Sequence, residues 1–222
     1  MLKDTVLIIL NYKRLDNIYY LVEKFKGKLP IYIINNNPSY RLHQIKGAGV
    51  VNKEKNGWCI ERWKFAKDLD YKYAIILDDD INPSFHCIMK LVTEIRKTPD
   101  RLVSIYGRSG INKVSRYEDL SSEWCIDTES DIAVGACLSV SIPHLKTIWK
   151  DYLEPWGTKD RGDDIQVSLS MSDYYKTRPK IIKTEVSLLE EGKVGLNKHP
   201  DHFSKRWKVI QDFRSPFLAS EN

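Results

Sequence analysis

Short apolar runs alternate with amphipathic stretches through the first half of the chain. The runs are continuous rather than alternating, which is typical of strands buried on both faces of a sheet. They predict strands at residues 5–10, 31–34, 73–77 and 102–106, with a weaker one near Val50 and Val51. Apolar positions spaced three and four residues apart predict helices between them. Strands that alternate with helices indicate an α/β domain with a mixed, mainly parallel central sheet.

The predicted helices of the first half begin at recognisable positions. Asp16 can cap the first helix, whose inward apolar positions run as far as Phe25. A second helix is expected at residues 58–67. Ser84 can cap a third, which ends before Pro99.

The second half of the chain has a less regular pattern. Residues 131–140 (DIAVGACLSV) predict one strand that contains a glycine, and residues 142–149 predict a short helix with Pro143 in its first turn. Residues 165–174 favour a helix, although their alternating apolar positions leave a strand open. Further strands are expected at residues 181–182 and 186–189, followed by a polar and basic tail from Gly192.

Composition narrows the class of protein. With 222 residues, 42% of them hydrophobic, the chain can build one sizeable core. A net charge of +5 is too mild for bulk nucleic-acid binding, but it suits an anionic small ligand such as a nucleotide. The N-terminal apolar segment is too short to span a membrane. The four cysteines form no CxxC pair, which favours reduced thiols and a cytoplasmic location.

Polar side chains follow three of the predicted strands. In open α/β sheets, ligands bind beyond the carboxyl ends of the strands, so these residues are candidates for a site. They are Asn11 to Arg14 (NYKR), Asn35 to Asn37 (NNN) and Asp78 to Asp80 (DDD). The amides of the first two strand ends can contact the edge of a nucleobase. The carboxylates of the third have a different role. For any one strand end, a loop that is polar by chance is as good an explanation as a ligand site. For all three ends together, chance is the weaker explanation.

The Asp triplet directly follows a buried strand, where adjacent carboxylates repel one another. Alternate residues of an extended segment point the same way, so we expect Asp78 and Asp80 to share a face and Asp79 to point opposite. Two carboxylates on one side form a site for Mg²⁺ or Mn²⁺, which takes one or two carboxylates and then the phosphates of a ligand. The alternative is a solvated acidic turn beside a helix N-terminus.

Taken in their order along the chain, these motifs resemble the nucleotide-sugar-dependent glycosyltransferases of the GT-A fold. The resemblance rests on NYKR, NNN and DDD together with VGA at residues 134–136 and GDDI at 162–165. The last two look most like the exostosin-type branch, and the chain is also similar to a glycosyltransferase domain of viral origin, which would place it in the host cytoplasm. The resemblance implies a Rossmann-like GT-A domain over residues 1–222. Residues 1–107 would bind the nucleotide, and residues 108–222 would form a less regular acceptor-side half with the basic tail.

The resemblance also implies which residues hold the nucleotide. Asn11 and Arg14 would contact the uridine and its phosphate side, and Asn35 and Asn36 the base or ribose. Asn56 and Arg62 match, with imperfect spacing, an Asn and an Arg that hold the nucleotide in exostosin-type enzymes. The implied set is Asn11, Arg14, Asn35, Asn36, Asn56 and Arg62, joined at the ribose by Asp78 or Asp79.

The metal and catalytic positions follow from the same resemblance. Asp80 would bind Mn²⁺ or Mg²⁺ directly, with Asp78 beside it, and His202 in the basic tail is a further candidate ligand. For a basic tail, however, a solvated surface is the commoner outcome. Asp164 matches the acidic residue that lies at the sugar in this branch. The family's usual EDI reads Asp163-Asp164-Ile165 here, so either aspartate could be catalytic.

The implied activity is metal-dependent transfer of a hexose or deoxyhexose, of glucose or rhamnose type, from a UDP-sugar to a glycan or glycoprotein. The branch suggests retention of configuration, whereas a base at Asp164 would suit inversion. Trp124 and Trp156 could pack against acceptor sugars, although Trp124 is more expected in the core.

Three other functions compete with a glycosyltransferase. A phosphatase places D-x-D after its first strand, and a nucleotidyltransferase usually has a glycine-rich loop near the N-terminus. This sequence shows neither feature. A non-catalytic nucleotide- or carbohydrate-binding module would need no acid at Asp164.

Overall fold

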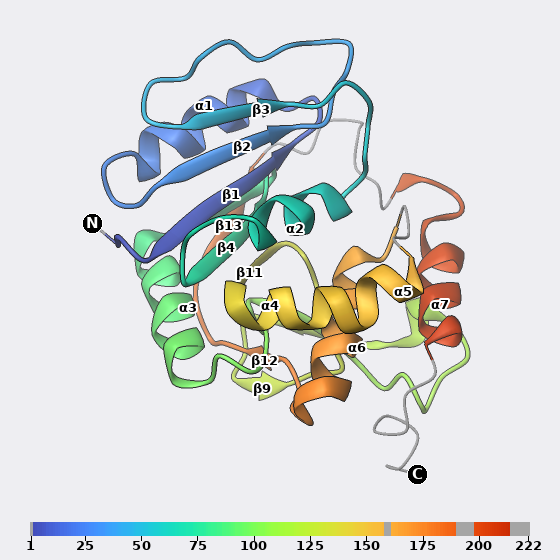
Figure 1. Ribbon diagram of the computed structural model, residues 1–222. Coiled ribbons are helices and arrows are strands. Elements are labelled where there is room, and N and C mark those ends of the chain that lie inside the picture. The colour runs from blue at the N-terminus through green and yellow to red at the C-terminus, as the bar shows by residue number, and fades with distance from the viewer. Residues whose placement is uncertain (1, 158–160, 190–197, 214–222) are drawn as a thin grey trace.

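The computed structural model describes residues 2–157, 161–189 and 198–213 (Figure 1). Its strands form a large central sheet in the order β3-β2-β1-β4-β11-β6-β12-β9, with two smaller sheets beside it. No helix within these ranges is both long and apolar enough to cross a membrane. The mixed α/β architecture predicted from the sequence is confirmed.

The first half of the central sheet is parallel. It consists of β1 (Thr5–Asn11), β2 (Ile31–Asn35), β3 (Gly49–Asn52) and β4 (Tyr73–Asp78). In this register Asn11 pairs with Asn35, and Leu10 pairs with Asp78. The carboxyl ends of the strands, with their polar residues, therefore lie along one edge of the sheet.

The second half of the central sheet is mixed. Here β11 (Cys137–Ser141) runs antiparallel to both β4 and β6 (Val103–Ser104). Next to β6 lie β12 (Lys180–Ile181) and β9 (Thr128–Glu129). The smaller sheets are β10 (Ile132–Ala133) with β7 (Tyr106–Ser109) and β8 (Ser121–Trp124), and β5 (Ile81–Pro83) with β13 (Val186–Leu188).

The strand predicted at residues 131–140 is in fact two strands in different sheets. The chain leaves β10, turns at Val134, Gly135 and Ala136, and enters β11. A side chain at Gly135 would displace the Arg62 guanidinium, because an added Cβ would lie 2.2 Å from Arg62 Nη2. The strand predicted at residues 102–106 is likewise divided between β6 and β7.

The helices of the described residues include all those predicted and two that were not, α5 and α7. They are α1 (Leu15–Phe25), α2 (Ile60–Lys67), α3 (Phe85–Lys97), α4 (Ile142–Ile148), α5 (Glu154–Trp156), α6 (Asp163–Tyr175) and α7 (His202–Asp212). A π-helical turn, η2 (Trp149–Leu153), joins α4 to α5, and a 3-10 turn, η1 (Tyr117–Asp119), precedes β8.

The helix starts test the capping predictions. Ser84 caps α3 as predicted, because its Oγ accepts a hydrogen bond from the Cys87 amide at 3.0 Å. The prediction for Asp16 is wrong: it lies inside the first turn of α1, where a carboxylate still favours the helix N-terminus. The predicted start of α2 at Trp58 is also wrong, because Trp58 has a φ of 62°, outside the helical region. Residues 163–175 form a helix, so the strand alternative for this segment is excluded.

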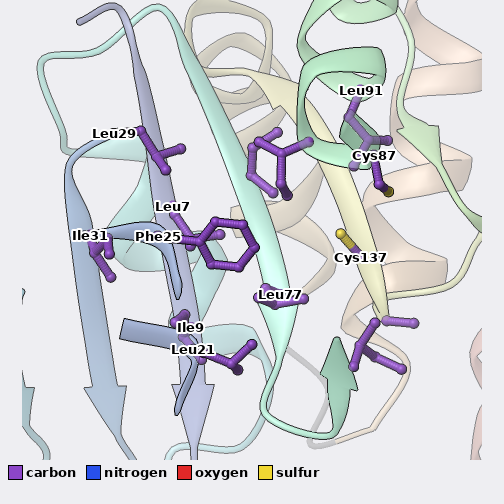
Figure 2. Close-up of a cluster of buried hydrophobic side chains, with 14 of the residues drawn as sticks. Leu7, Ile9, Leu21, Phe25, Leu29, Ile31, Leu77, Cys87, Leu91 and Cys137 are labelled. Atoms are coloured by element: carbon purple, nitrogen blue, oxygen red, sulfur yellow. The ribbon is translucent and has the colours of Figure 1, made fainter. Parts of the chain in front are cut away.

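The continuous apolar strands are buried on both faces. In β1, Leu7 and Ile9 face α1 and α3, whereas Val6 and Ile8 face the layer of α2, α4 and α6. Figure 2 shows the first of these cores, where Cys87 and Cys137 lie together as free thiols. In Figure 1, α2 and α4 lie in front of the sheet.

The basic tail was expected to be solvated, but residues 202–212 form the amphipathic helix α7. Its buried residues are Arg206, Val209 and Ile210, which pack against α6 and η1. The rest of the tail, at residues 190–197 and 214–222, lies outside the described residues.

Candidate functional site

A cavity of about 740 Å³ lies at the carboxyl ends of the parallel strands. It extends from β1 and β4 to the turn at Gly135, the N-terminus of α6 and helix α7. Ten of the residues predicted to form a site line it: Arg14, Asn36, Asn56, Arg62, Asp78, Asp79, Asp80, Asp163, Asp164 and His202. The topology therefore brings together motifs that are far apart in the sequence.

Asn11 and Asn35, which were expected to contact the nucleotide, are fully buried and do not line the cavity. Asn11 Nδ2 donates to Asn35 Oδ1 at 3.0 Å, and Asn35 Nδ2 donates to Asn52 Oδ1 at 2.8 Å and to the Tyr40 carbonyl at 2.6 Å. Asn11 and Asn35 are the last residues of β1 and β2, and their side chains point into the protein rather than into the cavity. These amides hold the ends of β1, β2 and β3 in register beneath the site.

Asn36 is the amide that reaches the cavity. Its Nδ2 donates to the Trp58 carbonyl at 2.7 Å. Its Oδ1 is buried and has no hydrogen-bond partner among the described residues. The left-handed turn at Trp58 is held by Asn56, whose Oδ1 accepts from the Trp58 amide at 2.9 Å. An unpaired buried acceptor is costly, so Asn36 is suited to a donor on a ligand.

Two cavity residues at this end were not predicted. Trp58 lines the cavity, and the guanidinium of Arg161 lies 5.5 Å from the centre of its ring. Arg161 also pairs with Asp201, next to α7. The Trp58 indole offers a flat surface for stacking, and the nearby Asn36 Oδ1 offers a hydrogen-bond acceptor for the edge of the same ligand. No local pattern in the sequence pointed to Trp58 or Arg161, because each acts only through its tertiary neighbours.

The Asp triplet meets two arginines. Arg14 forms an ion pair with Asp79 and a second with Asp80, whose Oδ2 lies 3.2 Å from Nη1. Arg62 pairs with Asp78. The expectation that Asp79 points away from Asp80 is therefore wrong. The strand ends at Asp78, the chain turns at once, and the extended alternation does not continue.

Carboxylate crowding changes the acidity of the triplet. Burial raises the pKa of Asp78 to about 8, and the neighbouring Asp80 and Asp79 carboxylates add to it while Arg62 opposes it. Burial likewise raises the pKa of Asp79 to about 6, against the effect of Arg14. Ionisation of the triplet is therefore disfavoured by burial and by mutual repulsion, and a cation bound beside these carboxyls would favour their ionised forms.

The two aspartates of GDDI have different partners. Asp163 Oδ2 accepts hydrogen bonds from Arg62 Nε at 3.0 Å, Arg62 Nη2 at 2.9 Å and Trp63 Nε1 at 2.7 Å. Asp164 Oδ2 accepts from Arg206 Nη2 at 2.9 Å and from the Gly135 amide at 3.1 Å. Asp163 therefore joins α6 to α2, whereas Asp164 faces the helix α7 and the glycine turn.

The charge of Asp164 is held by its surroundings. Burial alone would raise the pKa of this carboxyl, but Arg206, together with Arg62 and the Gly135 amide, lowers the pKa below its usual value. Arg206 is itself fixed by Tyr117, whose hydroxyl lies 2.8 Å from Nη2 and whose ring centre lies 4.6 Å from the guanidinium. The spacing of Arg206, Val209 and Ile210 on one helix face is the sequence signal for this contact.

Comparisons with known proteins identify the architecture. No protein-family model and no curated protein matches the chain. Among solved structures, the crystal structure of GalNAc-T7 with UDP, GalNAc and Mn²⁺ is similar, with a TM-score of 0.63 over 92% of this chain. The chain has the GT-A fold. It spans about half of the GalNAc-T7 chain, 47%, and the two are 10% identical in sequence, so the similarity concerns the fold alone.

The carboxylates of the cavity offer a limited donor set for a divalent cation. The described residues contain no group of three or more His, Cys, Asp or Glu side chains arranged to hold a metal. Asp78 and Asp80 nevertheless line the cavity with 37% and 22% of their side chains exposed. A hard cation that takes two carboxylates and completes its shell with water and phosphate fits this donor set.

His202, at the start of α7, lines the same cavity. Burial, followed by the nearby Arg206, lowers the pKa of His202 to about 4. The imidazole is therefore neutral at neutral pH, which is the form that binds a metal. Its Nδ1 is buried with no partner among the described residues.

Proposed function

We propose that the protein is a metal-dependent glycosyltransferase that moves a sugar from a UDP-sugar to a glycan acceptor. The observation that carries this proposal is the placement of Asp78, Asp80 and Asp164 around one cavity at the carboxyl ends of a GT-A sheet. A divalent cation and a diphosphate would bind at the triplet. The sugar would then lie towards Asp164.

The nucleoside end of the cavity is formed by Asn36 and Trp58. The free Oδ1 of Asn36 accepts an N–H from the base, and the indole of Trp58 provides a flat surface for stacking. The polar edge of uracil contains one N–H between two carbonyls, which suits a single amide acceptor. This is our reason to prefer a pyrimidine donor.

The diphosphate region combines carboxylates with arginines. When bound, the cation neutralises charge on the leaving diphosphate as the glycosidic bond breaks. Arg14 and Arg62 lie at the same carboxylates. With a cation at the triplet, these guanidinium groups would be placed to contact phosphate oxygens of the diphosphate.

Asp164 is proposed to act at the sugar. Arg206 keeps this carboxylate ionised, and a carboxylate of lowered pKa is a weak base. It is better suited to stabilising positive charge that develops on the sugar than to removing a proton. This supports retention of configuration, in line with the exostosin-type motifs. The donor sugar proposed from that resemblance is a hexose or deoxyhexose of glucose or rhamnose type.

The proposal is tested by ligand binding. We expect UDP with MnCl₂ to raise the melting temperature by several degrees, and UDP or MnCl₂ alone to do much less. ADP with MnCl₂ serves as the matched control and should have a smaller effect. Saturation-transfer NMR over a panel of UDP-hexoses then identifies the donor. Equal stabilisation by UDP with and without the metal would contradict the proposal.

A further inference from the structure

The small sheet beside the cavity carries two aromatic rings on one face. Tyr106 in β7 is paired with Trp124 in β8, so their side chains leave the sheet on the same side. The ring centres are 5.2 Å apart at an angle of 66°. Tyr106 lines the cavity, whereas Trp124 lies beyond it with 39% of its surface exposed. The expectation that Trp124 belongs to the core is wrong.

Polar groups flank this aromatic pair. Two residues along the same strands, Arg108 is paired with Ser122 on the same face. The Arg108 guanidinium lies 5.5 Å from the centre of the Tyr106 ring, and the Ser122 hydroxyl lies 3.5 Å from the Tyr106 hydroxyl. An exposed ring next to hydrogen-bonding groups matches a sugar, which has an apolar C–H face and polar edges.

A chain of contacts links the face to Asp164. Asp164 is bound by Arg206, and Arg206 by Tyr117. Arg108 lies 5.6 Å from the centre of the Tyr117 ring and also reaches Tyr106. These contacts lead from Asp164, at the proposed reaction centre, through Tyr106 to Trp124.

We propose that the Tyr106–Trp124 face binds a pyranose ring of the acceptor glycan, which stacks on Trp124 while its hydroxyl groups contact Arg108 and Ser122. This inference rests on the proposed function, because an acceptor must approach the sugar held near Asp164. Continuity of the face with the cavity favours a sugar over a partner protein. A protein that docked here would cover the mouth of the site.

The test compares variants on an array of defined glycans in the presence of UDP and MnCl₂. Trp124→Ala should bind the glycans recognised by the wild type about tenfold more weakly, because the stacking surface is lost. Trp124→Phe should retain most of the binding. Tyr20→Ala removes another exposed aromatic side chain, on α1 and outside the cavity lining, and should change nothing.

A parallel measurement separates this inference from the proposed function. Calorimetry should give the same UDP affinity, in MnCl₂, for Trp124→Ala and the wild type. Failure of the wild type to bind UDP would overturn the glycosyltransferase proposal itself. Normal UDP binding combined with unchanged glycan binding by Trp124→Ala, or with no glycan binding by the wild type, would overturn the acceptor subsite alone.

Discussion

Arg62 directs two nitrogens at one oxygen of Asp163, with Nε 3.0 Å and Nη2 2.9 Å from Oδ2. Its Nη1 donates to the Gly135 carbonyl at 3.0 Å and pairs with Asp78. One buried guanidinium thus joins α2, β4, the glycine turn and the N-terminus of α6. The positions of the catalytic candidates relative to one another depend on this side chain.

Removal of Arg62 should destabilise the fold. In Arg62→Met, Asp163 remains buried without its cation, and such a loss costs about 3–5 kcal/mol. Urea denaturation followed by far-UV circular dichroism measures the change. Arg116→Met, which removes an exposed ion pair with Asp119, is the control and should behave like the wild type. A stability of Arg62→Met equal to that of the control would show that the network contributes little.

Asp80 should be required for cation binding but not for folding. Its side chain is partly exposed at the cavity, so Asp80→Ala removes a carboxylate without opening the core. We expect this variant to lose the metal-dependent part of the UDP thermal shift and all transfer activity. The exposed Asp68, which directly follows α2 and does not line the cavity, provides a control in Asp68→Ala. Near-normal activity of Asp80→Ala in MnCl₂ would contradict the assignment.

Asn36 should determine the preference for a base. Asn36→Ala removes the free acceptor, so we expect UDP to bind roughly tenfold more weakly, the loss of about one hydrogen bond. ADP affinity, measured by the same calorimetric titration, should change much less. If the variant lost affinity for both nucleotides equally, Asn36 would support the loop at Trp58 rather than contact the base.

Asp164 and Asp163 should differ in their effects. We expect Asp164→Asn to lower kcat by roughly a hundredfold or more with little change in UDP affinity, because it neutralises the carboxylate proposed to act at the sugar. Asp163→Asn should instead lower stability, since Arg62 and Trp63 lose a charged acceptor. Steady-state kinetics and urea denaturation of both variants distinguish the two effects. A larger loss of kcat in a stably folded Asp163→Asn would assign the catalytic position to Asp163.

The sequence by itself determined the main strands and helices of the first half of the chain and their order. The continuous runs at β1, β2 and β4 predicted strands buried on both faces, and both faces are indeed covered. The motifs at the strand ends predicted where a site would form. Local pattern suffices for these features, because periodicity and capping depend on neighbours within a few residues.

Only the tertiary structure decided what each polar residue contacts. The sequence gives no sign that Asn35 turns inward while Asn36 faces the cavity, or that a two-residue change of direction places Asp79 beside Asp80. The pairing of Asp163 with Arg62 and of Asp164 with Arg206 joins segments far apart in the chain. Such contacts depend on the packing of whole helices against the sheet. The energy of a buried charge depends on its partner, and so does its chemical role.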